Sequence, residues 1–108
     1  MADLGMYILC DGLPVQCHDV IEWGAWMETN RGTQRIVART TAGDVTVSTV
    51  FLGLDHGFSF VRGGDGPPIV WETMIFGGLL DQYQDRYATR EQAIEGHARA
   101  VALAGLEP

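Results

Sequence analysis

Residues 35–51 read RIVARTTAGDVTVSTVF and contain two β-rich runs separated by the short turn Ala42-Gly43-Asp44. From Val45 to Phe51 successive side chains alternate between two faces, one of which is mainly apolar, as in a half-buried strand. The short connection that contains a glycine favours a hairpin between the two runs. This part of the chain therefore predicts an antiparallel sheet with one face against helices and the other wetter.

The remaining segments predict further strands and two helices. Apolar runs bounded by turn residues predict strands at residues 6–10, 69–76 and, as a short edge strand, 85–87. Asp19 and Thr89 are each followed three residues later by Glu or Gln, which is typical of a capped helix start. The predicted helices cover residues 20–28 and 90–104. The order β-α-β-β-β-(β)-α predicts one small two-layer α+β domain over residues 1–108, an antiparallel sheet of about four to five strands with two helices on one side.

Charge and hydropathy exclude several classes of protein. The chain has 14 acidic residues, 7 arginines and no lysine, with a net charge of −7, which argues against direct binding to nucleic acid. No apolar run is long enough to span a membrane, and residues 1–4 do not resemble a signal peptide. We therefore expect a cytoplasmic protein.

The two cysteines, Cys10 and Cys17, lie on either side of a turn, and their spacing leaves a disulfide geometrically open. Free thiols are expected in a protein without an export signal. Together with His18 the cysteines offer too few ligands for a structural zinc site, and their spacing matches no zinc pattern. We expect no metal and no cofactor.

The long Gly-rich segment 53–68 is the first candidate functional region. It carries Asp55, His56, Arg62 and Asp65, and long loops in small domains are often functional. A carboxylate beside a histidine is a pattern for acid–base catalysis. The structural alternative is that His56 hydrogen-bonds a backbone carbonyl and holds the turn.

His97 and Glu72 form the second candidate region. His97 falls on the apolar face of the last predicted helix, and Glu72 is the one charged residue inside the predicted strand 69–76. A buried carboxylate needs a partner, and the available ones are Arg39, Arg86 and His97. These residues predict either an ion-pair strut between sheet and helix or a polar pocket around a ligand.

No residue is a convincing nucleophile. Ser48 and Thr49 lie in mid-strand, Ser59 has no nucleophile elbow around it, and the glycines match no phosphate-binding loop. We therefore expect a protein that is not an enzyme.

The segments VARTTAGDVTVSTVFLGLDHGF, GPPIVWETMIFGG, DRYAT and EGH resemble a family of small proteins encoded by bacteriophages, prophages and their bacterial hosts. The resemblance covers nearly the whole chain, except that FSFVRGGDG departs from it like an insertion. It implies a phage or prophage setting in the host cytoplasm and no particular activity. Small acidic proteins of this kind often bind and block a host component, as anti-CRISPR proteins do.

The expected function is that of a non-enzymatic phage or prophage accessory protein that binds a host macromolecule with a basic surface, as an acidic inhibitor of a bacterial defence complex. The expected binding residues are Asp55, His56, Arg62, Asp65, Asp81 and Asp85. One alternative is a nucleotide-binding or sequestering protein with a pocket formed by Arg39, Glu72, Arg86 and His97. Others are a homo-oligomeric virion component and an enzyme with His56 as its base. The small size of the chain and its three tryptophans also favour a homodimer.

Overall fold

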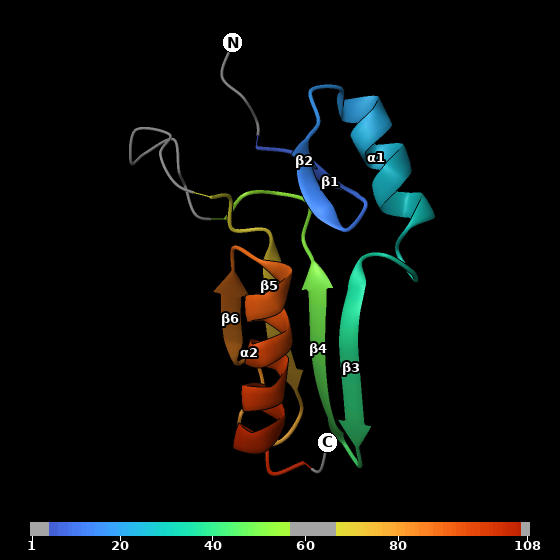
Figure 1. Cartoon of the computed structure of the whole chain (residues 1–108). Helices are drawn as coiled ribbons and strands as arrows, with labels where there is room; N and C mark the ends of the chain where they lie inside the picture. The colour runs from blue at the N-terminus through green and yellow to red at the C-terminus, as the bar shows by residue number, and fades with distance from the viewer. Residues whose placement is uncertain (1–4, 57–66, 107–108) are drawn as a thin grey trace.

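The computed structural model describes residues 5–56 and 67–106. Its elements, in chain order, are β1 (Tyr7–Cys10), β2 (Leu13–Gln16), α1 (Val20–Thr29), β3 (Ile36–Ala42), β4 (Val45–Phe51), β5 (Trp71–Phe76), β6 (Gln84–Tyr87) and α2 (Arg90–Leu103). Figure 1 shows a four-stranded sheet with α2 on it, and a second group made of β1, β2 and α1 at one end of that sheet. The predicted α+β fold is confirmed.

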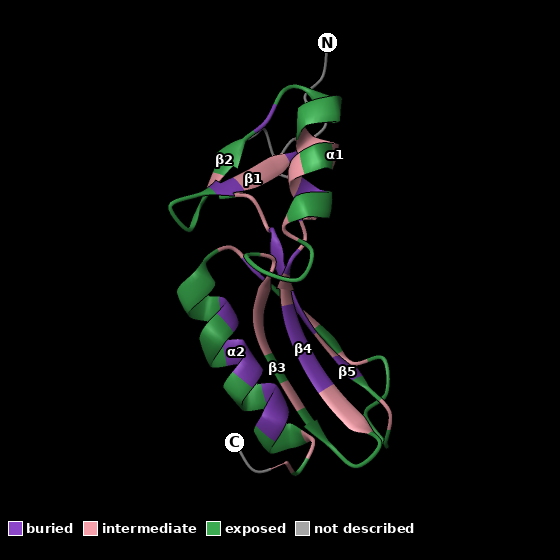
Figure 2. Cartoon of the chain, turned by 90° about the vertical axis from the view of Figure 1, so that its right-hand side faces the viewer, coloured by how far each residue is buried: buried purple, intermediate pink, exposed green. Residues whose placement is uncertain are grey.

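The larger sheet has the strand order β3-β4-β5-β6, with every neighbouring pair antiparallel. Its register places Val47 opposite Ile75 and Phe51 opposite Trp71, and all four side chains are buried. The helix α2 covers this face, and the buried side of the helix is turned toward the strands (Figure 2). Apolar burial between α2 and the sheet is therefore the main stabilising contact of this half of the molecule.

Strand alternation determines which side chains lie on the other face of the same sheet. Ser48, Met74 and Gln84 lie across from one another in β4, β5 and β6, and their side chains point away from α2. No helix among the described residues packs on this face (Figures 1 and 2). The prediction that one face is covered and the other is wetter is confirmed for the larger sheet.

The N-terminal elements differ from the prediction in their placement. The strand at residues 6–10 does not join the larger sheet but pairs with β2, a strand that was not predicted. The helix α1 packs beside β1, so only α2 lies on the face of the larger sheet. A strand as short as β2 that contains Pro14 has almost no sequence signal, because proline cannot donate a ladder hydrogen bond.

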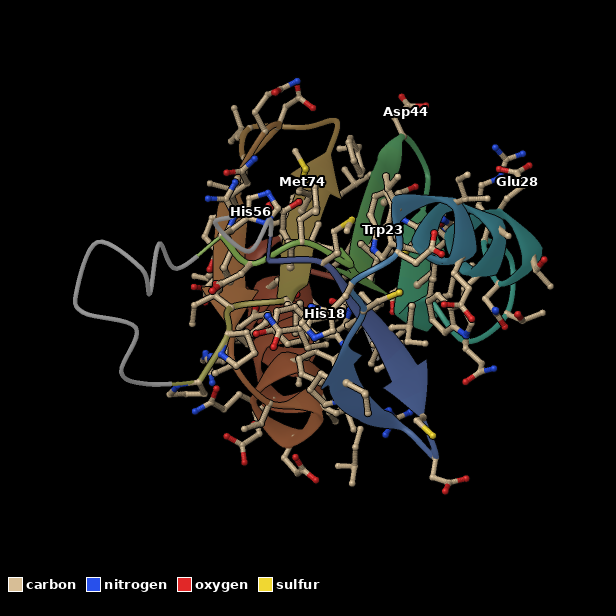
Figure 3. The ribbon with its side chains drawn as sticks, turned by 90° about the horizontal axis from the view of Figure 1, so that it is seen from above. His18, Trp23, Glu28, Asp44, His56 and Met74 are labelled. Atoms are coloured by element: carbon tan, nitrogen blue, oxygen red, sulfur yellow. The ribbon has the colours of Figure 1, made fainter. Side chains whose placement is uncertain are left out.

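Gly53 connects the two groups. Its carbonyl oxygen accepts hydrogen bonds from Tyr7 N at 2.8 Å and from Trp23 Nε1 at 3.1 Å. Its φ of 79° lies in the left-handed region, and a Cβ at this position would lie 2.6 Å from the sulfur of Met27. The left-handed backbone favours glycine here, and the end of the Met27 side chain occupies the space that a Cβ would take, so glycine suits the close approach of α1 to the end of β4; Figure 3 shows Trp23 on the inner side of α1.

The helix starts and the cysteines agree with the local predictions. Asp19 Oδ1 accepts hydrogen bonds from the backbone N–H groups of the first turn of α1, and Thr89 and Gln92 form a complete capping box at α2. Cys10 is exposed and Cys17 is buried, and both are free thiols. In the part of the chain that the structure describes, neither helix has the length and apolar character needed to cross a membrane.

Candidate functional site

Asp55 and His56 hold the chain at the edge of the segment 57–66. Asp55 Oδ1 accepts a hydrogen bond from Ile69 N at 2.9 Å, and His56 Nδ1 donates to Leu54 O at 2.9 Å. The predicted structural role of the loop histidine is confirmed. The other two predicted residues of this loop, Arg62 and Asp65, lie outside the described residues.

Asp81 and Asp85 also make internal contacts. Asp81 Oδ1 accepts from Gly77 N at 2.6 Å, which stabilises the turn between β5 and β6. Asp85 accepts from Arg86 N at 3.0 Å and lies 3.9 Å from Arg99 Nη2. The β5–β6 turn is at the opposite end of the sheet from the end of β4, which leads to Asp55 (Figure 1). The structure therefore does not bring the described acids of the predicted binding surface together.

Glu72 and Arg86 form an ion pair on the sheet face that α2 does not cover. They are opposite each other in the register of β5 and β6, and Arg86 Nε donates to Glu72 Oε2 over 2.8 Å. Arg39 is on the same face but in the other edge strand, where it lies opposite Ser48. These three members of the predicted pocket therefore share a face.

His97 lies on the other side of the sheet, so the predicted four-residue pocket is not assembled. Its Nδ1 atom is 2.7 Å from Thr49 Oγ1, its Nε2 atom is 2.9 Å from Thr40 Oγ1, and Thr49 Oγ1 in turn lies 2.5 Å from Thr73 Oγ1. The prediction of Glu72 as a partner for His97 is wrong, because strand alternation points Glu72 away from α2. Burial lowers the pKa of His97 below its ordinary value of 6.5, so the imidazole is neutral at pH 7.

A different cleft gathers exposed charged residues that form no ion pair or side-chain hydrogen bond within the described residues 5–56 and 67–106. It lies between the β1–β2 turn and the start of α2, has a volume of about 560 Å³, and we call it the hairpin–helix cleft. It is lined by Asp11, Gly12, Leu13, Pro14, Pro67, Pro68, Trp71, Ala88, Thr89, Arg90 and Glu91. The left-handed backbone of Asp11, with φ of 53°, shapes one wall, and the capping box at Thr89 sets the other.

The chemistry of the hairpin–helix cleft suits a cationic side chain. Asp11 and Glu91 are exposed, and within residues 5–56 and 67–106 no group forms an ion pair with their carboxylates or donates a hydrogen bond to them. Most of the other lining residues are apolar and give the cleft an apolar floor, and Trp71, which is 1% exposed, has an indole N–H with no hydrogen-bond partner in the described chain. A long basic side chain can lay its aliphatic stem on such a floor and place its charge near the carboxylates. Among the described lining residues Arg90 is the one cation, so the two carboxylates outnumber the guanidinium group there.

The sequence predicted neither Asp11 nor Glu91 as a site residue. One lies in a tight turn and the other in the first turn of a helix, where acids are common for local reasons. Only the packing of the N-terminal hairpin against the sheet end brings them to the same cleft.

No family model matches this chain, and no curated protein or solved structure matches it.

Proposed function

We propose that this chain is a non-enzymatic accessory protein of a phage or prophage that binds a host protein with a basic surface. The hairpin–helix cleft is the docking site. The observation that carries the proposal is the pair Asp11 and Glu91, two exposed carboxylates that line one largely apolar cleft and have no partner in the described part of the chain. Each would contact a Lys or Arg side chain of the host protein.

The internal contacts of the other polar groups support binding instead of catalysis. His97 is hydrogen-bonded to two threonines, His56 to a backbone carbonyl, and Glu72 to Arg86. These contacts assign three of the side chains that the sequence offered as acids, bases or orienting groups, His97, His56 and Glu72, to holding the fold. A binding protein needs no such group to be free.

The overall charge supports a basic partner. With a net charge of −7, the chain attracts a basic surface at a distance, and this attraction weakens as salt screens it. Asp55, Asp81 and Asp85 contribute to this general field, but each is also hydrogen-bonded internally. In this proposal Asp11 and Glu91 therefore contact the partner directly.

The test is capture of a partner from a bacterial lysate by the tagged protein at low and high salt, read by mass spectrometry. We expect a stoichiometric protein that is lost at high salt and is also lost at low salt with the double variant Asp11→Asn, Glu91→Gln. The matched control is Glu22→Gln, Asp44→Asn. It removes the same charge, and Glu22, like Glu91, stands in the first turn of its helix.

The control separates the cleft from net charge alone. Asp44 lies in the β3–β4 turn and points away from the body of the molecule (Figure 3). If both double variants lose the partner equally, binding follows net charge and the cleft is not the docking site. If neither variant loses it, the acidic mechanism is wrong.

A further inference from the structure

A groove runs between α2 and the edge strand β3, on the sheet face that α2 covers. Its volume is about 380 Å³, which is in the range of small-molecule sites, roughly 300–1,000 Å³. The groove is hollow because the residues that face each other across it are small, Ala38 on β3 and Ala98 and Ala102 on α2. Ile94, which is 46% exposed, gives it a further apolar wall.

The polar groups in the α2–β3 groove are Thr40 and His97, whose Oγ1 and Nε2 atoms are 2.9 Å apart. None of the described lining residues is charged, since burial keeps the imidazole neutral. The hydroxyl of Thr40 has one hydrogen and two lone pairs, and His97 engages only one of these three. Whichever tautomer His97 adopts, Thr40 Oγ1 therefore keeps a lone pair for an incoming donor.

We propose that this groove binds a small neutral molecule with an apolar body and one O–H or N–H group, which donates its hydrogen bond to Thr40 Oγ1. The uncharged lining disfavours an ionised ligand, because no group there would compensate its desolvation. A second copy of the chain would fill the groove poorly. If two β3 edges paired, the second strand would bring Ala38 and Thr40, both small, to this face. The site is independent of the hairpin–helix cleft.

The experiment measures the binding of 2-naphthol and 2-methoxynaphthalene to the full chain by calorimetry and by NMR shifts at Ala98 and His97. The two probes have the same ring system, and only 2-naphthol can donate a hydrogen bond. We expect 2-naphthol to bind about five-fold more tightly, as one hydrogen bond predicts. Thr40→Val should remove this difference by weakening 2-naphthol alone, and Thr40→Ser should keep it.

Ala98→Leu is the blocking variant, and we expect it to weaken both probes at least ten-fold by filling the groove. Its matched control is Ala25→Leu, an exposed alanine on α1, which should bind both probes as the parent does. The proposal is overturned if neither probe binds, if Ala98→Leu leaves binding unchanged, or if Thr40→Val leaves the preference for 2-naphthol intact. It is also overturned if the parent chain is a dimer that Ala98→Leu dissociates, because a second copy then occupies the groove.

Discussion

The Nδ1 atom of His97 lies 2.7 Å from the Oγ1 atom of Thr49, so an imidazole on α2 is hydrogen-bonded to a hydroxyl in the middle of the sheet. Both residues are buried, with 8% and 0% of their surface exposed. Thr49 also shares a hydrogen bond with Thr73 of the next strand. A neutral polar network thus fixes the position of α2 within an otherwise apolar interface, because each of its members would be costly to leave unpaired.

The first prediction concerns the pH dependence of stability. The unfolded chain protonates His97 near its ordinary pKa of 6.5, whereas burial lowers the pKa in the folded protein. Below pH 6.5 the unfolded state therefore binds more protons, and the free energy of unfolding falls as the pH decreases through the interval between the two pKa values. Urea unfolding of the parent and of His97→Gln at several pH values isolates this effect.

His97→Gln is expected to be less stable than the parent at neutral pH but to lose less stability on acidification. The other histidines and all carboxylates are common to both proteins, so their titration cancels in the comparison. Equal loss of stability in the two proteins between neutral and mildly acidic pH would show that His97 does not oppose folding when it is protonated.

The second prediction concerns two helical glycines that look alike in the sequence. A Cβ at Gly96 of α2 would overlap the phenol ring of Tyr87, which is itself buried, whereas a Cβ at Gly24 of α1 would meet no atom within 4 Å. We expect Gly96→Ala to lower the free energy of unfolding by about 2 kcal/mol, as overpacking does. Gly24→Ala should raise it by about 0.5–1 kcal/mol, because alanine favours a helix over glycine.

Urea denaturation of both glycine variants gives these values. The addition of Tyr87→Phe to Gly96→Ala should restore part of the lost stability, since the hydroxyl is the atom nearest to the new Cβ. A stabilised Gly96→Ala protein would contradict the close approach of Tyr87 to α2.

The third prediction concerns the ion pair between Glu72 and Arg86. Glu72 is 8% exposed, and Arg86 Nε is its hydrogen-bond partner at 2.8 Å. Arg86→Leu leaves a buried carboxylate without this donor, and we expect a loss of about 2 kcal/mol. The loss stays below that of a fully buried pair because the Arg86 side chain is 38% exposed.

The second variant in this test is Arg86→Leu combined with Glu72→Gln. It replaces the stranded carboxylate by a neutral amide, which costs less to bury, so part of the stability should return. If the double variant is less stable than Arg86→Leu alone, the carboxylate has another partner and the pair is not the relevant contact.

The fourth prediction separates stability from binding among the acids. Asp55 accepts a hydrogen bond from Ile69 N and Asp81 accepts one from Gly77 N. Asp55→Ala and Asp81→Ala should each lower the free energy of unfolding by about 1–3 kcal/mol, as the loss of a charge-assisted hydrogen bond does. Asp44→Ala is the control and should change it by no more than about 0.5 kcal/mol. Chemical denaturation of the three variants would contradict this assignment if all three unfolded alike.

Much of the secondary structure was predictable because its signals are local. Asp19 and Thr89 mark the helix starts through contacts within a few residues, and the alternation from Val45 to Phe51 shows the strand directly. The strand β2 was missed because it has four residues, one of them Pro14, and it owes its existence to pairing with β1. A segment stabilised mainly by its neighbour in space carries little pattern of its own.

The candidate sites were less predictable than the secondary structure, because they depend on how the elements pack together. Which residues alternate along each strand, and where each helix begins, can be read from the amino-acid sequence alone, since both follow from backbone periodicity and capping. Which sheet face α2 covers depends on the packing of the whole chain. This packing pairs His97 with Thr40 and Thr49 and leaves Glu72 to pair with Arg86 on the other face. It also decided that Asp11 and Glu91 line the same cleft. The physical reason is that residues far apart in the chain meet only through the packing of whole elements, which no local pattern encodes.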